Sequence, residues 1–372
     1  MNDLHGIIFA YRSHRNLGEL TRHRNTCSVP YGGRYRLIDF MLSSMVNAGV
    51  SDIGLVVHEN YQSLLDHVGS GKDWDLSRKR GGLRILPPFS TSERTQGEYR
   101  GTMEALVGVS SYLRNIRQEY VVLAWGDLAI NLPLSDVFQQ HLSSGSDITV
   151  VCSQTHRGLP EECQYVQTDA SGRVVDITVR PSTPPAGALE SLEIFIMSKK
   201  LLLELVDHCA AHDLYSFSRG ALLPRISTLN ILPYEFDGYV GRFQSVREYF
   251  CRSADLLRPD VHSDLFNPNS PVRTKDRFDP STYYGPDSRC VNSLIADGCV
   301  IEGEVENSIL FPGVVVEKGA KVSGCILMQN TVIGTNAGIS YAIADKNVRI
   351  GEQRTLSGHE TYPIAIAKNT VV

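Results

Sequence analysis

The sequence predicts a Rossmann-like α/β domain over residues 1–255, a linker over 256–288 and a parallel β-helix over 289–372. Three observations carry this prediction. Short, continuously apolar strands alternate with amphipathic helices in the first part of the chain. A stretch rich in proline, aspartate, asparagine and serine follows. After it, aliphatic residues recur six positions apart between regularly spaced glycines.

Length and composition allow two domains with full cores. The chain has 372 residues, of which 42% are hydrophobic and 21% charged. The formal net charge of −5 argues against a nucleic acid or a membrane surface as the partner, because both favour a basic face. No apolar run is long enough to span a bilayer, and the first residues do not resemble a signal peptide. Eight scattered cysteines without a CxxC pair indicate reduced thiols in a cytoplasmic chain.

The first part of the chain has the pattern of a sheet covered by helices. We expect strands at 6–10, 53–57, 120–125 and 147–152, and helices at 37–48 and 102–113. Apolar strands that do not alternate with polar residues indicate a mostly parallel sheet, buried on both faces. In such a sheet, ligands bind beyond the carboxyl ends of the strands.

The C-terminal part has a different rhythm. The stretch 259–286 shows little periodicity, which predicts a linker. Aliphatic pairs six positions apart follow it: Leu294 and Val300, Val316 and Val322, Ile326 and Val332. This spacing is typical of a parallel β-helix, whose coils must stack to bury their interior. A small antiparallel sheet with turns is the alternative.

Several motifs follow one another in a fixed order. They are YGGRYRLIDF at 31–40, YRGTMEA at 99–105, Gly-Asp at 126–127 after a strand, and IEGEVENSILFPGV at 301–314. Together they resemble the motifs of bacterial glucose-1-phosphate adenylyltransferase (ADP-glucose pyrophosphorylase). The resemblance runs from about Gly6 to Gly351 and implies a nucleotidyltransferase domain followed by a left-handed β-helix. It also implies that Gly101 and Thr102 face a nucleotide.

The family joins glucose 1-phosphate to ATP and releases pyrophosphate. The protein must position two anions and offset growing negative charge. A glycine-rich loop, basic side chains and carboxylates that hold Mg²⁺ supply these functions.

The nucleotide loop departs from the family pattern. Where the family has LAGGxGTRL, this chain has FAYRSHRNL, so Tyr11, Arg12 and His14 replace three glycines. We expect these side chains to crowd the triphosphate and to disfavour left-handed turns. The catalytic arginine of the loop aligns with Asn16, which is uncharged. Arg12 or Arg15 is the alternative source of that charge.

The residues of the basic clamp and of the metal site also depart from the family pattern. Thr26 stands at the lysine of the family motif KPAVP. Asp127 remains at the end of a strand, where a Mg²⁺ ligand is expected, and a capping or turn aspartate is the alternative. Arg242 stands at the second carboxylate, which puts a cation where a cation should bind.

The sugar-phosphate side is partly kept. Arg180 replaces the lysine of the family motif EEKP and can still bind a phosphate, although the acid before it is Val179. Ser191 matches a sugar-phosphate serine, but Gln164 and Glu193 replace two glycines. Weak sugar-phosphate binding at Arg180 and Ser191, or an ordinary surface arginine, are the two interpretations.

A basic cluster near the N-terminus is a candidate effector site. The resemblance implies that Arg24 and Arg36 contribute to binding a phosphorylated effector. Their basic neighbours in the sequence are Arg12, Arg15, Arg22 and His23. We expect the cluster to bind an anionic effector or a partner subunit, and a solvated basic face is the alternative.

The residues of the family pattern are lost at four sites, while the motifs of its fold are kept. This combination predicts a catalytically impaired, regulatory subunit. The resemblance implies a catalytic glucose-1-phosphate adenylyltransferase subunit as its partner in a heterotetramer, with Mg²⁺ only in that partner and no cofactor here. An active adenylyltransferase with an atypical loop, or a sugar-phosphate-sensing or structural β-helix protein, are the alternatives. A β-helix acyltransferase is disfavoured, because no histidine occurs between Gly285 and Ser357.

Overall fold

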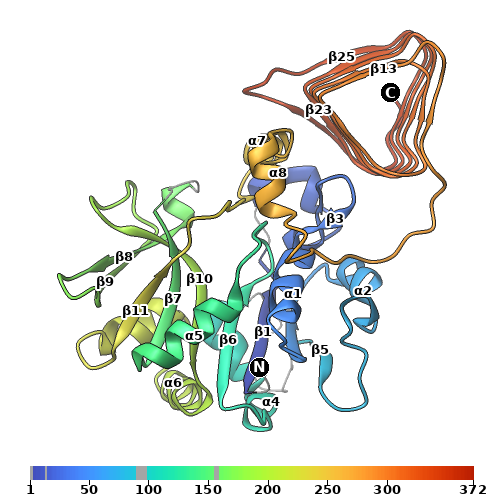
Figure 1. The fold of residues 1–372 in the computed structure, drawn as a ribbon. Coiled ribbons are helices and arrows are strands. Elements are labelled where there is room, and N and C mark those ends of the chain that lie inside the picture. The colour runs from blue at the N-terminus through green and yellow to red at the C-terminus, as the bar shows by residue number, and fades with distance from the viewer. Residues whose placement is uncertain (1–2, 13–14, 89–98, 155–158) are drawn as a thin grey trace.

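The computed structural model describes residues 3–12, 15–88, 99–154 and 159–372. It contains an α/β domain and a triangular prism of stacked strands that lies beside it (Figure 1). Helices α7 (Val246–Asp255) and α8 (Pro259–Leu265) lie between the two domains. In the part of the chain that the structure describes, no helix is long and apolar enough to cross a membrane.

A mixed sheet forms the centre of the α/β domain. Its main path runs β11 (Ile231–Glu235), β7 (Ile148–Ser153), β10 (Leu189–Ser198), β6 (Tyr120–Trp125), β1 (Leu4–Ala10), β4 (Asp52–Val57), β5 (Gly82–Leu86). An antiparallel extension from β10 consists of β8 (Gln164–Thr168) and β9 (Val174–Val179). The strands expected from apolar runs are confirmed as β1, β4, β6 and β7. Their runs are apolar because their side chains are buried on both faces of the sheet.

Strand β10 interrupts the parallel arrangement. It runs antiparallel to both of its neighbours, β6 and β7. Its register against β7 shifts between Ser191 and Ile194, so Leu192 and Glu193 form a bulge. Glu193 adopts a left-handed backbone with φ of 56°. Bulges redirect side chains, and this one turns Glu193 toward the cleft described below.

Helices cover both faces of the sheet. One face carries α1 (Leu37–Asn47), α2 (Gln62–Val68) and α5 (Leu134–Ser144). The other carries α3 (Thr102–Gly108), α4 (Ser110–Arg114) and α6 (Lys199–Ala211). The single helix expected at 102–113 is therefore two helices, because the backbone at Val109 leaves the helical region with φ of −106° and ψ of 18°. The short hairpin before α1 consists of β2 (Pro30–Tyr31) and β3 (Tyr35–Arg36).

The C-terminal domain is a left-handed parallel β-helix, as predicted. One sheet contains β12 (Tyr283–Tyr284), β15 (Val300–Ile301), β18 (Val315–Val316), β21 (Val332–Ile333) and β24 (Arg349–Ile350). The second contains β13 (Arg289–Val291), β16 (Glu304–Glu306), β19 (Lys321–Ser323), β22 (Gly338–Ser340) and β25 (Thr355–Ser357). The third contains β14 (Leu294–Ile295), β17 (Ile309–Leu310), β20 (Ile326–Leu327), β23 (Ala342–Ala344) and β26 (Ile364–Ile366). Neighbouring coils pair in parallel, as Val300 with Val315, so the antiparallel alternative is wrong.

The segment expected to be a linker is partly ordered into regular structure. Helix α8 lies within it, and β12 begins the β-helix before the expected boundary at residue 289. Pro259 stands in the first turn of α8, where its missing N–H costs nothing. Val261 and Leu265 are buried on one face of this helix. The proline-rich composition therefore concealed a short helix with an i, i+4 apolar pair.

One hydrophobic core joins the two domains. It takes residues from the α/β domain, from α7 and α8, and from the β-helix, including Tyr31, Phe40, Tyr249, Phe250, Leu265, Ile309, Phe311, Ile326 and Met328. The contact between the domains is therefore a packed interior and not a flexible tether.

Candidate functional site

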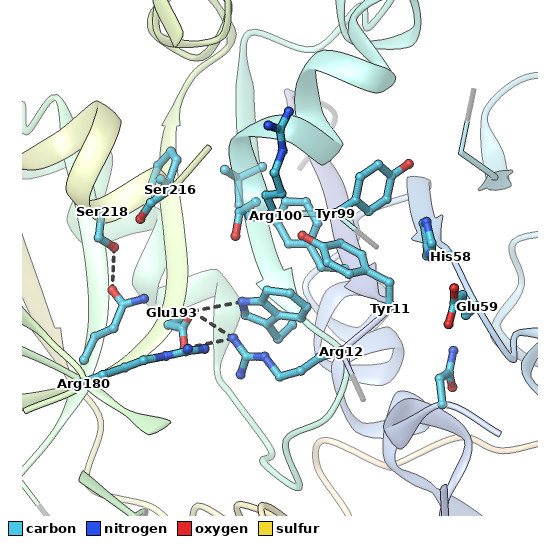
Figure 2. A pocket seen from close by; sticks show the side chains of 18 of the residues that line it. Tyr11, Arg12, His58, Glu59, Tyr99, Arg100, Arg180, Glu193, Ser216 and Ser218 are labelled. Atoms are coloured by element: carbon cyan, nitrogen blue, oxygen red, sulfur yellow. Dashed lines mark hydrogen bonds and ion pairs between the residues drawn. The ribbon is translucent and has the colours of Figure 1, made fainter. Parts of the chain in front are cut away.

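A cleft of about 870 Å³ opens at the carboxyl ends of the central strands (Figure 2). Tyr11 and Arg12 follow β1, His58 and Glu59 follow β4, and Trp125 ends β6, and all five side chains line the cleft. The cleft thus lies at the place where a ligand is expected in a parallel α/β sheet.

The start of α3 forms another wall of the cleft. Gly101 and Thr102, expected to face a nucleotide, line it. A Cβ on Gly101 would lie 2.3 Å from the carbonyl oxygen of Tyr215, a distance that real Cβ atoms do not reach. The N–H of Met103 donates to the same carbonyl at 2.9 Å. Gly101 therefore allows α3 to begin directly against the segment at Tyr215.

Aromatic rings fill the cleft beside β1. Tyr11, which stands at a glycine of the family loop, makes edge-to-face contacts with Tyr99 and Trp125, with ring centroids 5.0 Å apart in each case. Phe9 lies 6.0 Å from the Tyr11 ring. Burial raises the pKa of the Tyr11 hydroxyl, so it stays neutral. The substitution thus replaces an open loop with a packed aromatic wall.

Arg12 is held inside the cleft by an internal carboxylate. Its Nη2 lies 3.1 Å from each carboxylate oxygen of Glu193, and its Nη1 lies 3.8 Å from Asp127 (Figure 2). The guanidinium stacks 3.8 Å from the centroid of the Trp125 ring, and Trp125 Nε1 donates to Glu193 at 3.1 Å. Burial opposes the charge of Arg12, but Glu193 and Asp127 more than offset this, so its pKa is raised.

A second arginine is buried beside the first. Arg242 is 3% exposed, lies 2.5 Å from a carboxylate oxygen of Glu190, and donates to the carbonyl oxygen of Ser191 at 2.7 Å. The pKa of Arg242 is also raised: its burial lowers it, and the charge of Glu190 outweighs that effect. Both arginines thus bind carboxylates from β10: Glu190 lies before the bulge and Glu193 lies within it.

The donor set at Asp127 does not fit Mg²⁺. Asp127 is 4% exposed and has the Arg12 guanidinium beside it, and a second guanidinium stands at residue 242. Residues 3–12, 15–88, 99–154 and 159–372 contain no group of three or more His, Cys, Asp or Glu residues placed to hold a metal ion. A divalent cation would have to share this space with two positive charges.

The other expected catalytic positions lie away from the cleft wall. Thr26 is completely buried, and its hydroxyl has no hydrogen-bond partner among the described residues. Asn16 is exposed at the start of a 3₁₀ segment, Arg15–Thr21. His14 lies outside the described residues. Ser191 is 1% exposed and its hydroxyl accepts the N–H of Glu193 at 3.1 Å, so it supports the bulge.

Cations remain at the opposite end of the cleft. Arg180 lines it with its side chain 60% exposed, 3.9 Å from Glu162. Arg219, which the sequence analysis did not single out, also lines it and donates to the carbonyl of Val179 at 2.9 Å. Ser218 lines the same end and donates to the side-chain oxygen of Gln164. This end offers two guanidinium groups and hydroxyls to an anionic ligand.

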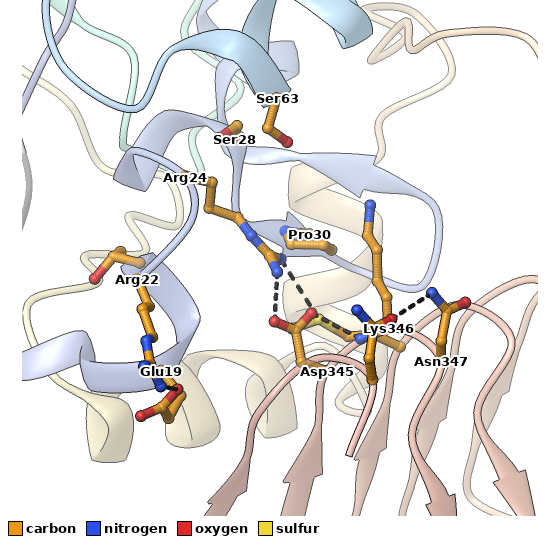
Figure 3. Close-up of polar contacts among 12 residues, drawn as sticks. Glu19, Arg22, Arg24, Ser28, Pro30, Ser63, Asp345, Lys346 and Asn347 are labelled. Carbon is orange, nitrogen blue, oxygen red and sulfur yellow. Dashed lines mark hydrogen bonds and ion pairs between the residues drawn. The ribbon is translucent and has the colours of Figure 1, made fainter. Parts of the chain in front are cut away.

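The structure separates the residues of the expected basic cluster. Arg22 pairs with Glu19 at the rim of the cleft, whereas Arg24 and Arg36 point toward the β-helix and α2 respectively (Figure 3). Arg24 is 4% exposed and binds Asp345 of the β-helix. A solvated basic face is therefore wrong for Arg24.

The environment of Arg24 and Arg36 is nevertheless positive. Arg36 donates to the carbonyl and hydroxyl of Ser63 at 2.5 and 2.9 Å. Burial, with the nearby charge of Arg24, lowers the pKa of Arg36 to about 10. Lys346 of the β-helix lies beside both arginines, and burial together with their charges lowers its pKa to about 7. Three cations and Asp345 thus meet where the two domains touch.

The acidic partners of the arginines were not predicted from the sequence. Glu190 and Glu193 bind Arg242 and Arg12, which are 52 and 181 residues away from them in the chain. The sequence did contain a signal for such pairing, because the departures from the family pattern introduce cations at two positions and an acid at a third. Such opposite changes favour a contact between them. Nothing in the sequence pointed to Asp345 and Lys346.

An α/β domain with a cleft at the carboxyl edge of its sheet, followed by a β-helix, defines a two-domain protein of the nucleotidyl transferase type. A family model described as nucleotidyl transferase matches residues 6–237, and one described as GlmU-like C-terminal hexapeptide matches residues 281–361. The chain therefore belongs to the nucleotidyl transferase family, together with the GlgD and glucose-1-phosphate adenylyltransferase proteins to which it is similar over most of its length.

Three relatives illustrate this similarity. The glycogen biosynthesis protein GlgD of Bacillus subtilis (strain 168) is 34% identical over 372 residues, which cover 100% of this chain and 97% of the relative. GlgD of Geobacillus stearothermophilus is 35% identical over 324 residues, 86% and 83% of the two chains. The glucose-1-phosphate adenylyltransferase of Fervidobacterium nodosum is 30% identical over 355 residues, 94% and 84% of the two chains.

Proposed function

We propose that this chain is a regulatory, catalytically impaired subunit of glucose-1-phosphate adenylyltransferase in glycogen biosynthesis. It modulates a catalytic partner subunit within a cytoplasmic heterotetramer, and Mg²⁺ acts only in that partner. The GlgD relatives carry glycogen biosynthesis in their names, and the other relatives are glucose-1-phosphate adenylyltransferases, which supports the pathway and the partner.

The observation that carries the proposal is the Arg12–Glu193 pair in the cleft. A polyphosphate needs preorganised donors and an open path along the loop after β1. Here it would meet the Tyr11 ring and the carboxylate of Glu193, and it would have to take Arg12 away from a carboxylate whose two oxygens it already contacts. Nucleotide binding in the geometry of the active family is therefore opposed by both charge and volume.

Two ligand sites belong to this proposal. Arg180 and Arg219 bind a sugar phosphate such as glucose 1-phosphate weakly, because both guanidinium groups line the cleft and Arg180 is exposed. A phosphorylated effector binds near Arg24, Arg36 and Lys346, where an added phosphate would relieve the repulsion among three cations.

An active adenylyltransferase is the second candidate function. The observation that favours it is that Arg12 still carries its positive charge into the cleft, where it could serve a phosphate if Glu193 moved away.

Synthesis of ADP-glucose tests both candidates. It is measured for this chain alone, for a catalytic subunit of the same source alone, and for the two co-expressed. A silent single chain that raises turnover or shifts the effector response of the mixture supports regulation. Synthesis by the single chain at a rate comparable to that of the catalytic subunit supports the active enzyme and refutes the proposal. A mixture that behaves as the catalytic subunit alone refutes it as well.

A further inference from the structure

Five charged residues from four separate segments meet in the wall of the cleft and behind it. Arg12 follows β1, Asp127 follows β6, Glu190 and Glu193 belong to β10, and Arg242 precedes α7. The side chains are between 2% and 17% exposed in their ion pairs. The central strand β1, its neighbour β6 and the antiparallel strand β10 are thus joined by charge as well as by backbone pairing.

We propose that Arg12 and Arg242 are built-in counter-ions that lock the cleft in one conformation, so that the carboxylates in its wall and behind it require neither a divalent cation nor a bound nucleotide. The charged residues then form one interdependent set, and their departures from the family pattern are not separate losses. The inference concerns the chain's own charges and holds whether or not the chain makes ADP-glucose.

Burial makes the pairing of these charges necessary. A carboxylate or guanidinium that is removed from water is costly unless it is paired, and removing one partner of a buried pair leaves the other uncompensated. Glu193 is paired with Arg12 at 3.1 Å, and Glu190 is paired with Arg242 at 2.5 Å. Removing either arginine therefore takes a counter-charge away from a buried acid of β10.

The geometry of the contacts around Glu193 also favours a fixed arrangement. The planar guanidinium of Arg12 meets both oxygens of Glu193 at equal distances of 3.1 Å and rests on the Trp125 ring. A single nitrogen, Nη2, makes both contacts, and the stacking of the guanidinium on the Trp125 ring is what favours arginine over lysine. Trp125 binds the same carboxylate through Nε1, so the acid is held from two sides. The bulge on β10 supplies the turn that makes this contact.

A double-mutant cycle on thermal unfolding tests the interdependence. The variants are Arg12→Gln, Glu193→Gln and the double variant, and Glu193→Gln keeps an acceptor for Trp125. We expect each single change to lower the Tm by roughly 4–6 °C and the double change to lower it by clearly less than the sum. The exposed pair Arg114 and Asp207 is the matched control, and Arg114→Gln and Asp207→Asn should add within error.

Magnesium provides the second readout. The Tm of the unmodified chain should be the same in millimolar MgCl₂ and in NaCl of equal ionic strength, because the arginines already balance the carboxylates. Additive effects of Arg12→Gln and Glu193→Gln, or a rise of the wild-type Tm specific to Mg²⁺, would overturn the proposal. If the single variants do not fold, a folded double variant supports the lock and an unfolded one refutes it.

Discussion

Arg24 and Asp345 form a buried ion pair between the α/β domain and the β-helix (Figure 3). The two side chains are 5% and 2% exposed, and they are 321 residues apart in the chain. Arg24 also approaches the sulfur of Met328 at 3.9 Å, so one guanidinium contacts two coils of the β-helix. The charges at this interface therefore bear on both domain packing and the proposed effector site.

Replacing Arg24 alone is expected to destabilise the protein. Arg24→Ala leaves Asp345 buried without its counter-charge, which costs about 3–5 kcal/mol in the free energy of unfolding. Arg24→Ala/Asp345→Ala removes both charges and should recover a large part of this loss. Urea unfolding measures the difference. A double variant as unstable as the single one would show that packing, and not charge, sets the contribution of Arg24.

The same variants test the effector site, and the double variant separates an effect on folding from an effect on effector binding. Arg24→Ala/Asp345→Ala and Arg36→Ala are assembled with the catalytic subunit, and the response to a phosphorylated effector is measured. We expect a weakened response in both mixtures. An unchanged response in folded, assembled variants would discard the assignment of Arg24 and Arg36 to effector binding.

Lys346 is expected to make stability depend on pH. Its pKa is lowered to about 7 by burial and by Arg36 and Arg24, whereas an unfolded lysine titrates near ~10.4. Between these values the unfolded chain binds more protons, so this group makes the free energy of unfolding rise with pH and imposes its full penalty below about pH 7. Asp345 opposes the shift, and Lys368 adds to it.

Lys346→Met measures this contribution. The variant should have a higher Tm than the unmodified chain near neutral pH, and the difference should shrink as the pH rises toward ~10. The exposed neighbour Lys368→Met is the control and should show a smaller difference at all pH values. A Lys346→Met effect that does not change with pH would contradict the lowered pKa.

The interdomain core is expected to be essential for stability. Phe311 is 1% exposed and packs in the core that joins the domains, so Phe311→Ala should lower the free energy of unfolding by about 3–5 kcal/mol. Tyr362 is 81% exposed on the same domain, and Tyr362→Ala should change it by less than about 0.5 kcal/mol. A small effect of Phe311→Ala would mean that the domains are held by the polar contacts instead.

Gly101, which directly precedes α3, and Gly108, its last residue, give a matched pair. Gly101→Ala forces a Cβ against the Tyr215 carbonyl and should cost about 1–3 kcal/mol. Gly108→Ala meets no atom closer than 3.8 Å and should stabilise the protein by about 0.5–1 kcal/mol. Calorimetry of the two variants checks the signs. Equal effects would show that the segment at Tyr215 yields to the added methyl group.

Periodicity made most of the fold predictable. The strand at Ile7 is apolar at nearly every position, and the β-helix repeats its aliphatic spacing, so both domains follow from local pattern. Strand β10 was not predicted. Its antiparallel direction could not have been, because the sequence of a fully buried strand does not indicate which way the strand runs. Helix α8 was missed because proline and aspartate, which favour loops, also favour helix N-termini.

The candidate site was predictable only in part. The position of the cleft follows from the parallel strands, and the family motifs point to Arg12 and Arg242. Their partners do not follow, because a contact between Arg12 and Glu193 depends on a bulge in β10 that changes the direction of one side chain. Long-range pairing of charges is a property of the packed structure and not of any segment.

The core shared by the domains has a consequence for how the protein is made. Tyr31 and Phe40 emerge from the ribosome early, whereas Met328 and Ile343, which belong to the same core, come last. At ~5–20 residues per second, synthesis of the chain takes roughly 20–70 s. Until these coils are made, the inner surface of α1 and its neighbours stays uncovered, and such an exposed apolar face is prone to aggregation.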